Sequence, residues 1–181
     1  MAELLDNQRA NAVFDIFEHT AFRLETRDVY VVDREQERFR RFLAGEREND
    51  RHPTRSSEWW TRIRRLTGDG KRVERVRVVT EPLTDYSRWL LHVGQHGTAA
   101  GEDIRYLPRS SVGELGIPYV DDYWLFDSRM AHLFHFEEDG RVKGRELIED
   151  PATIVRLNYV RDAAWHYAIR WEVFADKHGL R

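Results

Sequence analysis

Arg72-Val-Glu-Arg-Val-Arg-Val-Val-Thr80, then Glu81-Pro-Leu-Thr-Asp-Tyr86 and, further on, Ala100-Gly-Glu-Asp-Ile-Arg-Tyr-Leu-Pro-Arg109 form the stretch that decides the fold. The valines of Val73–Val79 are typical of a strand that is buried on one face. Pro82 suits the first turn of a helix that ends near Gly94–Gly97, and Ile104–Leu107 again have the composition of a strand. The stretch therefore predicts a strand, a helix and a second strand, with charged residues crowded where strands meet loops.

Upstream of this stretch, the apolar pattern predicts helices on either side of one strand. Phe22 and Leu24 alternate with Arg23 and Glu25, which indicates a half-buried strand. Caps, glycine stops and helical spacing of apolar residues define the remaining elements. We expect a helix over Asn7–His19, a strand over Thr20–Thr26 with Val29–Val32 as its bent continuation, a helix over Asp33–Gly45, a polar surface loop over Glu46–Ser57, and a helix capped by Ser57, with Trp59 and Trp60 in the core, that stops at Gly68–Gly70.

Downstream, the sequence predicts a loop, an aromatic strand, a hairpin and a helix. Asp150 and Pro151 suit a helix cap and a first helical residue, and apolar residues at helical spacing continue to Phe174, so we expect one long C-terminal helix. The other elements are a loop over Pro108–Pro118, a strand over Asp122–Phe126, and a hairpin of Met130–Phe136 with Val142–Ile148. Together these elements predict a mixed α/β (α+β) fold, with one domain over residues 1–181 and helices packed on the faces of a mixed sheet.

The composition excludes several classes of protein. Hydrophobic residues make up 41% and aromatic residues 12% of the chain, which is enough apolar material for a folded core despite 34% charged residues. The absence of cysteine excludes disulfides, thiolate metal sites and a cysteine nucleophile. The net charge of −3 comes from interspersed acids and bases, which disfavours direct nucleic-acid binding. Because no secretory leader or membrane-spanning apolar run is found, we expect no membrane partner and a cytoplasmic location.

Charged side chains of the central stretch form the main candidate ligand site. In an open α/β sheet, ligands bind outside the carboxyl ends of the strands, where amides of the next helix also face. An anionic or zwitterionic ligand would suit such a site. The alternative is that these arginines and acids pair with one another across neighbouring strands and hold the sheet together. The candidate residues are Arg75, Arg77, Glu81, Asp85, Tyr86, Arg88, Glu102, Asp103, Arg105 and Arg109.

Further acids and histidines of the sequence are candidates for catalysis or metal binding. Asp127 closes the aromatic strand that Asp121 and Asp122 precede, and such carboxylates either serve acid–base chemistry or form turns at strand ends. His132 and His135 fall on opposite faces of one strand and cannot easily share a metal. His92 and His96 lie one helical turn apart without a third ligand, so we expect a surface pair. Nucleophile elbows, phosphate loops and dinucleotide fingerprints are also missing, so we predict neither metal nor cofactor.

Five separated motifs, in order, carry a resemblance over nearly the whole chain: Phe22–Thr26, Arg75–Tyr86, Ala100–Arg109, Trp124–Asp127 and Asp150-Pro151. They resemble an uncharacterised actinobacterial domain-of-unknown-function family (DUF6879-like). This resemblance implies a small protein associated with a helix-turn-helix regulator and supplies no catalytic residues. The chain is also weakly similar to the phospholipase D-like fold, but it lacks that family's His-x-Lys-x-x-x-x-Asp motif.

The leading functional hypothesis is a non-enzymatic regulatory or ligand-sensing accessory protein. It would bind a small anionic ligand or a partner protein at the central crevice, which is the site formed by the charged side chains of the central stretch. The partner implied by the resemblance is a helix-turn-helix regulator. The alternative is an enzyme acting on a small metabolite or a phosphodiester, with Glu81, Asp103 or Asp127 as the acid and Arg105 as the anion holder.

Overall fold

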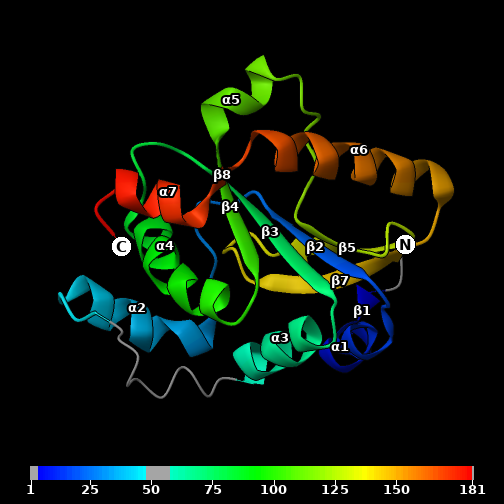
Figure 1. Ribbon diagram of the computed structural model, residues 1–181, viewed down its shortest axis with the longest axis horizontal. Helices are drawn as coiled ribbons and strands as arrows, with labels where there is room; N and C mark the ends of the chain where they lie inside the picture. The colour runs from blue at the N-terminus through cyan, green and yellow to red at the C-terminus, as the bar shows by residue number, and fades with distance from the viewer. Residues whose placement is uncertain (1–3, 48–57, 181) are drawn as a thin grey trace.

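A computed structural model describes residues 4–47 and 58–180, and all its strands belong to one mixed sheet (Figure 1). The strand order is β1-β7-β6-β5-β2-β3-β4-β8. The predicted mixed α/β fold is thereby confirmed. The strands are β1 (Leu4–Leu5), β2 (Thr20–Glu25), β3 (Arg72–Val79), β4 (Asp103–Pro108), β5 (Tyr123–Phe126), β6 (Met130–Phe136), β7 (Val142–Ile148) and β8 (Ile169–Arg170).

The centre of the sheet is parallel and its flanks are antiparallel. β2 pairs with β3 and β3 with β4 in parallel, so helical crossovers must connect these strands. β5, β6 and β7 follow as an antiparallel series beside β2, and β6 and β7 form the predicted hairpin. Parallel pairing brings the carboxyl ends of β2, β3 and β4 to the same edge of the sheet.

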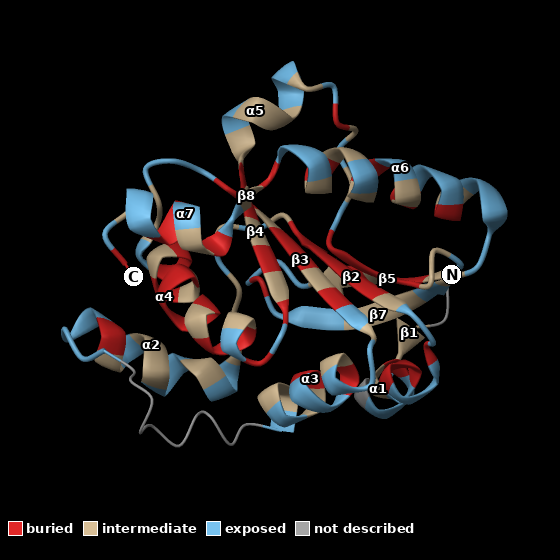
Figure 2. Ribbon diagram, viewed as in Figure 1, coloured by how far each residue is buried: buried red, intermediate tan, exposed pale blue. Residues whose placement is uncertain are grey.

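Helices cover both faces of the sheet (Figure 1). One apolar cluster lies between α6 and the central strands, and a second lies on the other face under α1 and α3. A third joins α4 and α7 to β3 and β4, and Figure 2 shows the buried residues concentrated in these layers. The helices are α1 (Asn7–Ile16), a 3₁₀ turn η1 (Asp33–Glu35), α2 (Gln36–Leu43), α3 (Glu58–Gly68), α4 (Asp85–Ala99), α5 (Arg109–Glu114), α6 (Pro151–Tyr167) and α7 (Trp171–Lys177).

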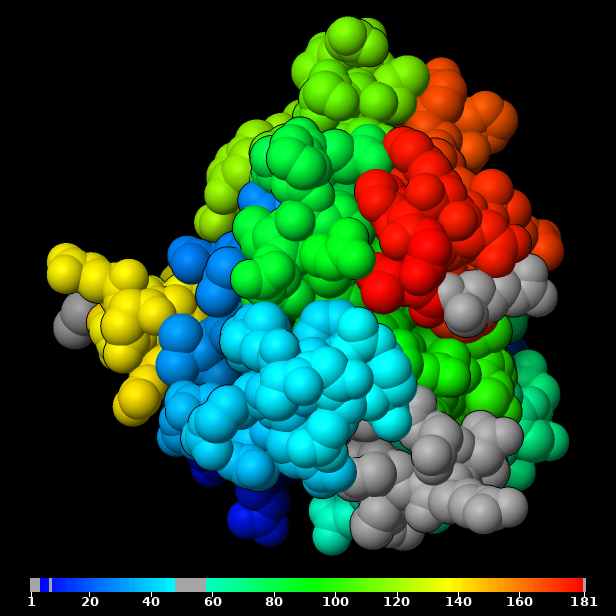
Figure 3. Space-filling view, turned by 90° about the vertical axis from the view of Figure 1, so that its left-hand side faces the viewer, coloured from blue at the N-terminus to red at the C-terminus, as the bar shows by residue number. Residues whose placement is uncertain are grey.

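α2 forms an outer layer on α4. Phe39 and Phe42 of α2 pack against Tyr86, Trp89 and Val93, and Figure 3 shows α2 spread over this side of the molecule beside the segment that follows β2.

Polar caps set the starts of three helices. The side chain of Asp6 accepts a hydrogen bond from the Arg9 amide at 2.7 Å, and Asp150 accepts one from the Thr153 amide at 2.8 Å. α4 is capped by Thr84, so it begins at Asp85 rather than at Pro82 as the sequence suggested.

The predicted C-terminal helix divides into two. α6 ends at Tyr167, Ala168 is extended, and β8 then pairs with Arg105 and Tyr106 of β4 before α7 begins. The apolar residues of the two halves belong to different clusters, because those of α6 pack under the central strands whereas Trp171 and Phe174 pack against α4 and β4. One helix could not reach both places.

Four smaller expectations also differ. The segment predicted as a loop over Pro108–Pro118 contains α5, Val29–Val32 is not a strand, and β1 was not foreseen. α4 continues through Gly94 and Gly97, because these glycines allow close packing rather than ending the helix: a Cβ at Gly94 would lie 2.7 Å from Nε1 of Trp171. Most of the predicted loop Glu46–Ser57, with the cap Ser57, lies outside the described residues.

Within residues 4–47 and 58–180, none of the helices has both the length and the hydropathy needed to cross a bilayer.

Candidate functional site

The carboxyl ends of the parallel strands are tied together by Arg109 and Asp28. The Asp28 carboxylate, just after β2, accepts hydrogen bonds from the amide and the hydroxyl of Thr80 at 2.8 and 2.7 Å. Arg109, at the start of α5, donates to Thr80 Oγ1 at 3.0 Å, to Asp28 Oδ2 at 3.3 Å and to the Thr26 carbonyl at 2.6 Å. Arg109 therefore links the ends of three strands.

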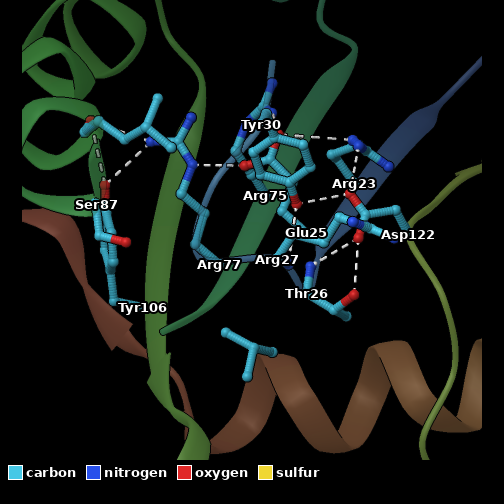
Figure 4. A network of polar contacts seen from close by, with 12 residues as sticks. Arg23, Glu25, Thr26, Arg27, Tyr30, Arg75, Arg77, Ser87, Tyr106 and Asp122 are labelled. Atoms are coloured by element: carbon cyan, nitrogen blue, oxygen red, sulfur yellow. Dashed lines mark hydrogen bonds and ion pairs between the residues drawn. The ribbon is translucent and has the colours of Figure 1, made fainter. Parts of the chain in front are cut away.

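Arg75 and Arg77 form a closed ionic network with two carboxylates. Strand alternation turns both arginines away from Val76, onto the face opposite α6. Glu25 of β2 accepts hydrogen bonds from Nη1 of Arg75 and, at 2.5 Å, from Nε of Arg77. Arg75 also donates from Nε to Glu102 at 2.7 Å. Figure 4 shows Arg75 and Arg77 beside Glu25, so this part of the predicted crevice is filled by its own charges.

The charges of this network are held fixed near neutral pH. Burial disfavours the ionised form of Glu25, but Arg75, Arg77 and Arg23 outweigh burial and hold the pKa of this carboxyl well below its usual range. Burial also opposes the charge of Arg75 and Arg77, and their carboxylate partners outweigh it and raise both pKa values. A general acid or base must change its charge near the working pH, and these three groups do not.

A second branch of the network, around Asp122, was missed at the sequence level. Asp122 is fully buried and accepts hydrogen bonds from Arg23 Nη2, the Thr26 amide and hydroxyl, and the Tyr30 hydroxyl, at 2.7–2.8 Å. The sequence placed Asp122 at a strand end without assigning it a partner. The only signal was an acid next to an aromatic strand, which is equally typical of a turn.

The expectation that β2 is half-buried was wrong. Arg23 and Glu25 are only 5% and 9% exposed. Alternating charged and apolar residues usually mean that one face meets water, but here the charged face meets ionic partners from β3 and from the segment before β5. Partners far away along the chain leave no local signal.

Glu81, which precedes α4, and Tyr86, in the first turn of α4, have partners outside the network. Glu81 pairs with Lys177 at 2.7 Å and with His178 at 3.1 Å, and the hydrogen bond from Lys177 lowers the pKa of this carboxyl. Tyr86 is buried and donates to Glu35 at 2.9 Å.

Asp85, Arg88, Asp103 and Arg105 do not join the network. Asp85 is exposed in the first turn of α4, and Arg88 is half-buried further along the helix. Arg105 pairs with Asp103 at 3.1 Å, and its guanidinium lies 3.7 Å from the ring centroid of Trp165 on the α6 face of the sheet. The candidate residues therefore divide between both faces of the sheet.

Asp127 lies at the opposite edge of the sheet from Arg109. Its carboxylate accepts hydrogen bonds from the amides of Glu18, His19 and Thr20 at 2.7–2.8 Å, where β2 begins. Burial opposes the charge, but these three amides outweigh it and lower the pKa of Asp127. The geometry is that of a cap on the turn before β2.

The buried ionic layer carries more positive than negative charge. Across residues 4–47 and 58–180, its arginines are Arg23, Arg75, Arg77 and Arg145, and its carboxylates are Glu25, Glu102 and Asp122. Arg145 is the member without a carboxylate partner in this part of the chain, and its polar contact is a 3.4 Å hydrogen bond to Oδ1 of Asn11. The layer therefore has one unbalanced guanidinium.

The histidines follow the predictions only in part. His92 and His96 are 7% and 5% exposed, so the expected surface pair was wrong, because α2 and α3 cover this side of α4. His132 is buried on the α1 face, and His135, on the other face of β6, pairs with Glu146 at 2.9 Å. His96 also lines a cavity of about 300 Å³ with Trp60, Arg64 and Ala99. In the described part of the chain, metal-ligating side chains do not gather in groups of three or more.

Solved structures that resemble this chain in shape include TrmBL2 and NucT. TrmBL2, an archaeal chromatin protein whose structure shows a novel mode of DNA binding, is 9% identical with a TM-score of 0.48; the alignment covers 90% of this chain and 50% of that one. This chain thus spans half the length of TrmBL2. NucT from Helicobacter pylori is also 9% identical, with a TM-score of 0.47, over 94% of this chain and 97% of that one. Neither likeness carries a conclusion about this chain. None of the curated proteins compared with the sequence matches it.

The family is shown by the sequence itself. The model of the family described as "Domain of unknown function (DUF6879)" matches residues 8–176, which is nearly the whole chain. The predicted resemblance is confirmed for the family, and the chain belongs to the DUF6879 family.

Proposed function

We propose that this chain is a single-domain, cytoplasmic, non-enzymatic ligand-sensing protein that binds a small anionic ligand. The supporting observation is the surplus positive charge of the buried layer, in which Arg145 lacks a carboxylate partner within residues 4–47 and 58–180. A partly buried charge without a partner of opposite sign is costly, and a bound anion would balance it.

The ligand site of this proposal is narrower than the crevice expected from the sequence. Arg75, Arg77, Glu102 and Arg109 are engaged in bonds that hold the strands together. An anion would have to displace carboxylates from Arg75 or Arg77 to bind there. At the β7 end of the same layer, the positive charge of Arg145 has no carboxylate partner in the described residues that an anion would have to displace.

The non-enzymatic part of the proposal rests on the placement of the carboxylates. Glu25, Glu102 and Asp122 are paired with buried arginines. The acids of the enzymatic alternative lie apart: Glu81 follows the end of β3, Asp103 opens β4 and Asp127 caps the start of β2. Two carboxylates that act on one substrate must flank it, and these three do not. The expected phospholipase D-like fold and actinobacterial origin remain predictions.

The experiment that tests this function is isothermal titration calorimetry of the wild-type protein with inorganic phosphate and with malonate. The ionic strength is held constant with chloride, because phosphate also stabilises proteins by exclusion from their surface. Saturable binding of either anion is the expected result. If both titrations give only heats of dilution, the proposed function is wrong.

A second candidate function, docking of a partner protein, is favoured by the outer side of α6. Val155, Tyr159 and Tyr167 of this helix are 69%, 56% and 49% exposed and recur at intervals of four or eight residues. Exposed apolar and aromatic side chains on one helix are typical of interfaces. The partner proposed is the helix-turn-helix regulator that the family resemblance implies, with no direct nucleic-acid contact by this chain.

Docking at α6 is tested by mixing the purified chain with that regulator and asking whether the two proteins elute as a complex. Tyr159→Ser should abolish the complex, whereas Val142→Ser, an exposed apolar residue on β7, should leave it intact. An unchanged complex with Tyr159→Ser would remove α6 as the docking surface. A salt-sensitive shift of duplex DNA by this chain alone would contradict the expected absence of direct nucleic-acid binding.

A further inference from the structure

Three side chains on the sheet face opposite α6 each have a buried nitrogen atom without a hydrogen-bond partner in the described ranges. Arg23 pairs through Nη2, but its Nη1 has no acceptor. The same is true of Nε of Arg145 and of Nδ1 of His132, and Arg23 and His132 are only 5% and 2% exposed. Buried polar groups are almost always hydrogen-bonded in proteins, so three unsatisfied nitrogens on one face of the sheet need an explanation.

The sheet register brings these three residues together. Arg23 lies across from Trp124, which lies across from His132, and Arg145 lies across from Phe134. Because side chains alternate along each strand, all of them project from the same face. The guanidinium carbons of Arg23 and Arg145 lie 3.8 and 4.9 Å from the centroid of the same Phe134 ring. Two guanidinium groups therefore converge beside one aromatic ring.

The charges around Arg145 are of one sign. Burial, together with the positive charges of Arg23 and Arg34, lowers the pKa of Arg145 to about 10, so Arg145 remains charged near neutral pH. Asp122 neutralises Arg23, and its oxygens also accept hydrogen bonds from Thr26 and Tyr30. Negative charge is thus provided for Arg23 and not for Arg145.

The outer end of this cluster, at Arg145, lies near the surface of the protein. Arg145 is half-buried, and Arg34, close enough to affect it, is exposed. The tip of the β6–β7 hairpin borders this end, where the Val31 amide donates to the Gly140 carbonyl at 3.3 Å, and Figure 3 shows the hairpin tip beside the segment that follows β2. The cluster therefore lies close to the surface at Arg145, whereas its three unsatisfied nitrogens are themselves buried.

We infer that Arg23, Arg145 and His132 form a seat for a small oxyanion, the phosphate or carboxylate group of a metabolite. The inference rests on the proposed function and names the site and the ligand chemistry that the function requires. An arginine fork fits the paired oxygens of both groups, and a neutral histidine adds one N–H donor. The ligand supplies the missing negative charge and the acceptors for the three unsatisfied nitrogens.

The seat is tested by titrating inorganic phosphate and malonate into wild type, Arg145→Gln and Lys143→Gln at constant ionic strength. Lys143→Gln is the matched control, because it removes the same charge from an exposed position on the same strand. Arg23→Gln is avoided, since it would unpair Asp122. Circular dichroism confirms that each variant is folded. We expect Arg145→Gln to weaken binding by about tenfold or more and Lys143→Gln by less than about twofold. Arg145→Lys, which keeps the charge and loses the fork, should fall between them.

The outcomes separate this inference from the proposed function. If wild type binds an anion and Arg145→Gln binds it as well as Lys143→Gln does, the seat is overturned while the function stands. If wild type binds neither anion, both are overturned. A response to phosphate alone assigns a phosphoryl ligand, and a response to malonate alone assigns a carboxylate, and either one, when lost in Arg145→Gln, supports the seat.

Discussion

Glu25 of β2 lies in register with Arg77 of β3 and accepts a hydrogen bond from its Nε at 2.5 Å. The same carboxylate also receives Arg75, so a single acid on one strand neutralises two arginines on the next. This arrangement ties the centre of the parallel sheet together by charge as well as by backbone hydrogen bonds.

Glu25→Gln should strongly destabilise the protein. The variant leaves two buried guanidinium groups with one carboxylate fewer, and breaking a buried ion pair costs about 3–5 kcal/mol. Urea denaturation measures the change in the free energy of unfolding. Glu37→Gln, which removes an exposed partner of Arg40, is the control and should change it by less than about 0.5 kcal/mol. Equal effects in the two variants would contradict a structural role for the network.

In buffer without multivalent anions, Arg145→Gln should not destabilise the protein, in contrast to Glu25→Gln. Arg145 is half-buried without a carboxylate partner in the described residues, so removing its charge should leave the free energy of unfolding unchanged or raise it by about 1 kcal/mol. Arg75→Gln, which unpairs Glu102 and removes one of the arginines bound to Glu25, should lower it by about 3 kcal/mol or more. The comparison uses the same urea titrations. A loss of similar size in both variants would show that Arg145 is part of the balanced network.

Stability should fall as the pH falls below about 6.5, and His132 should account for part of the loss. Burial and the nearby charge of Arg145 lower the pKa of His132 from 6.5 to about 4. Between these values the unfolded chain binds more protons than the folded one, so acidification favours unfolding, by roughly 2–3 kcal/mol over the whole window. Glu25, whose pKa lies below its ordinary value of 4.5, adds a further loss below that pH.

The variant His132→Gln isolates the first part of this loss. Urea titrations at a series of pH values from 7 to 5 should give a flatter profile for the variant than for wild type, because Glu25 stays ionised throughout this range. Parallel profiles for the two proteins would mean that His132 does not titrate as its surroundings require.

Gly94→Ala should loosen the contact between α4 and α7. A Cβ at Gly94 would lie 2.7 Å from Nε1 of Trp171, the atom that donates to the Leu91 carbonyl at 2.8 Å. Because the indole is buried and cannot retreat freely, we expect a loss of about 1–3 kcal/mol in the free energy of unfolding. Gly113→Ala in α5, where a Cβ meets nothing within 4 Å, should be neutral or slightly stabilising. If both substitutions are neutral, the two helices do not depend on this close approach.

Local patterns were enough to predict most of the fold. The valines of β3, the hairpin of β6 and β7, and the caps Asp150 and Pro151 all act over a few residues, and the structure has them where the sequence placed them. The division between α6 and α7 was not foreseen, because both halves show helical spacing and the choice of packing partner is made by β4.

The contacts of the candidate site were even harder to predict from local sequence patterns than the fold. The sequence identified Arg75, Arg77 and Glu102, but their pairing partners lie 27 to 52 residues away, and Arg23 meets Asp122 across 99 residues. Whether the charged residues of a strand meet water or each other depends on such long-range contacts. These contacts cannot be predicted from a single sequence. His132 and Arg145 became candidates only when the register placed them beside Arg23.

We propose that the arginines of the central stretch hold the sheet together, whereas Arg145 and Arg23 bind an anion. This division of roles is tested most directly by nuclear magnetic resonance of the arginine Nε–Hε groups during a titration with inorganic phosphate at constant ionic strength. We expect saturable shifts of the Arg145 and Arg23 signals, while those of Arg75 and Arg77 stay in place. Saturable shifts at Arg75 and Arg77, with Arg145 unmoved, would contradict it.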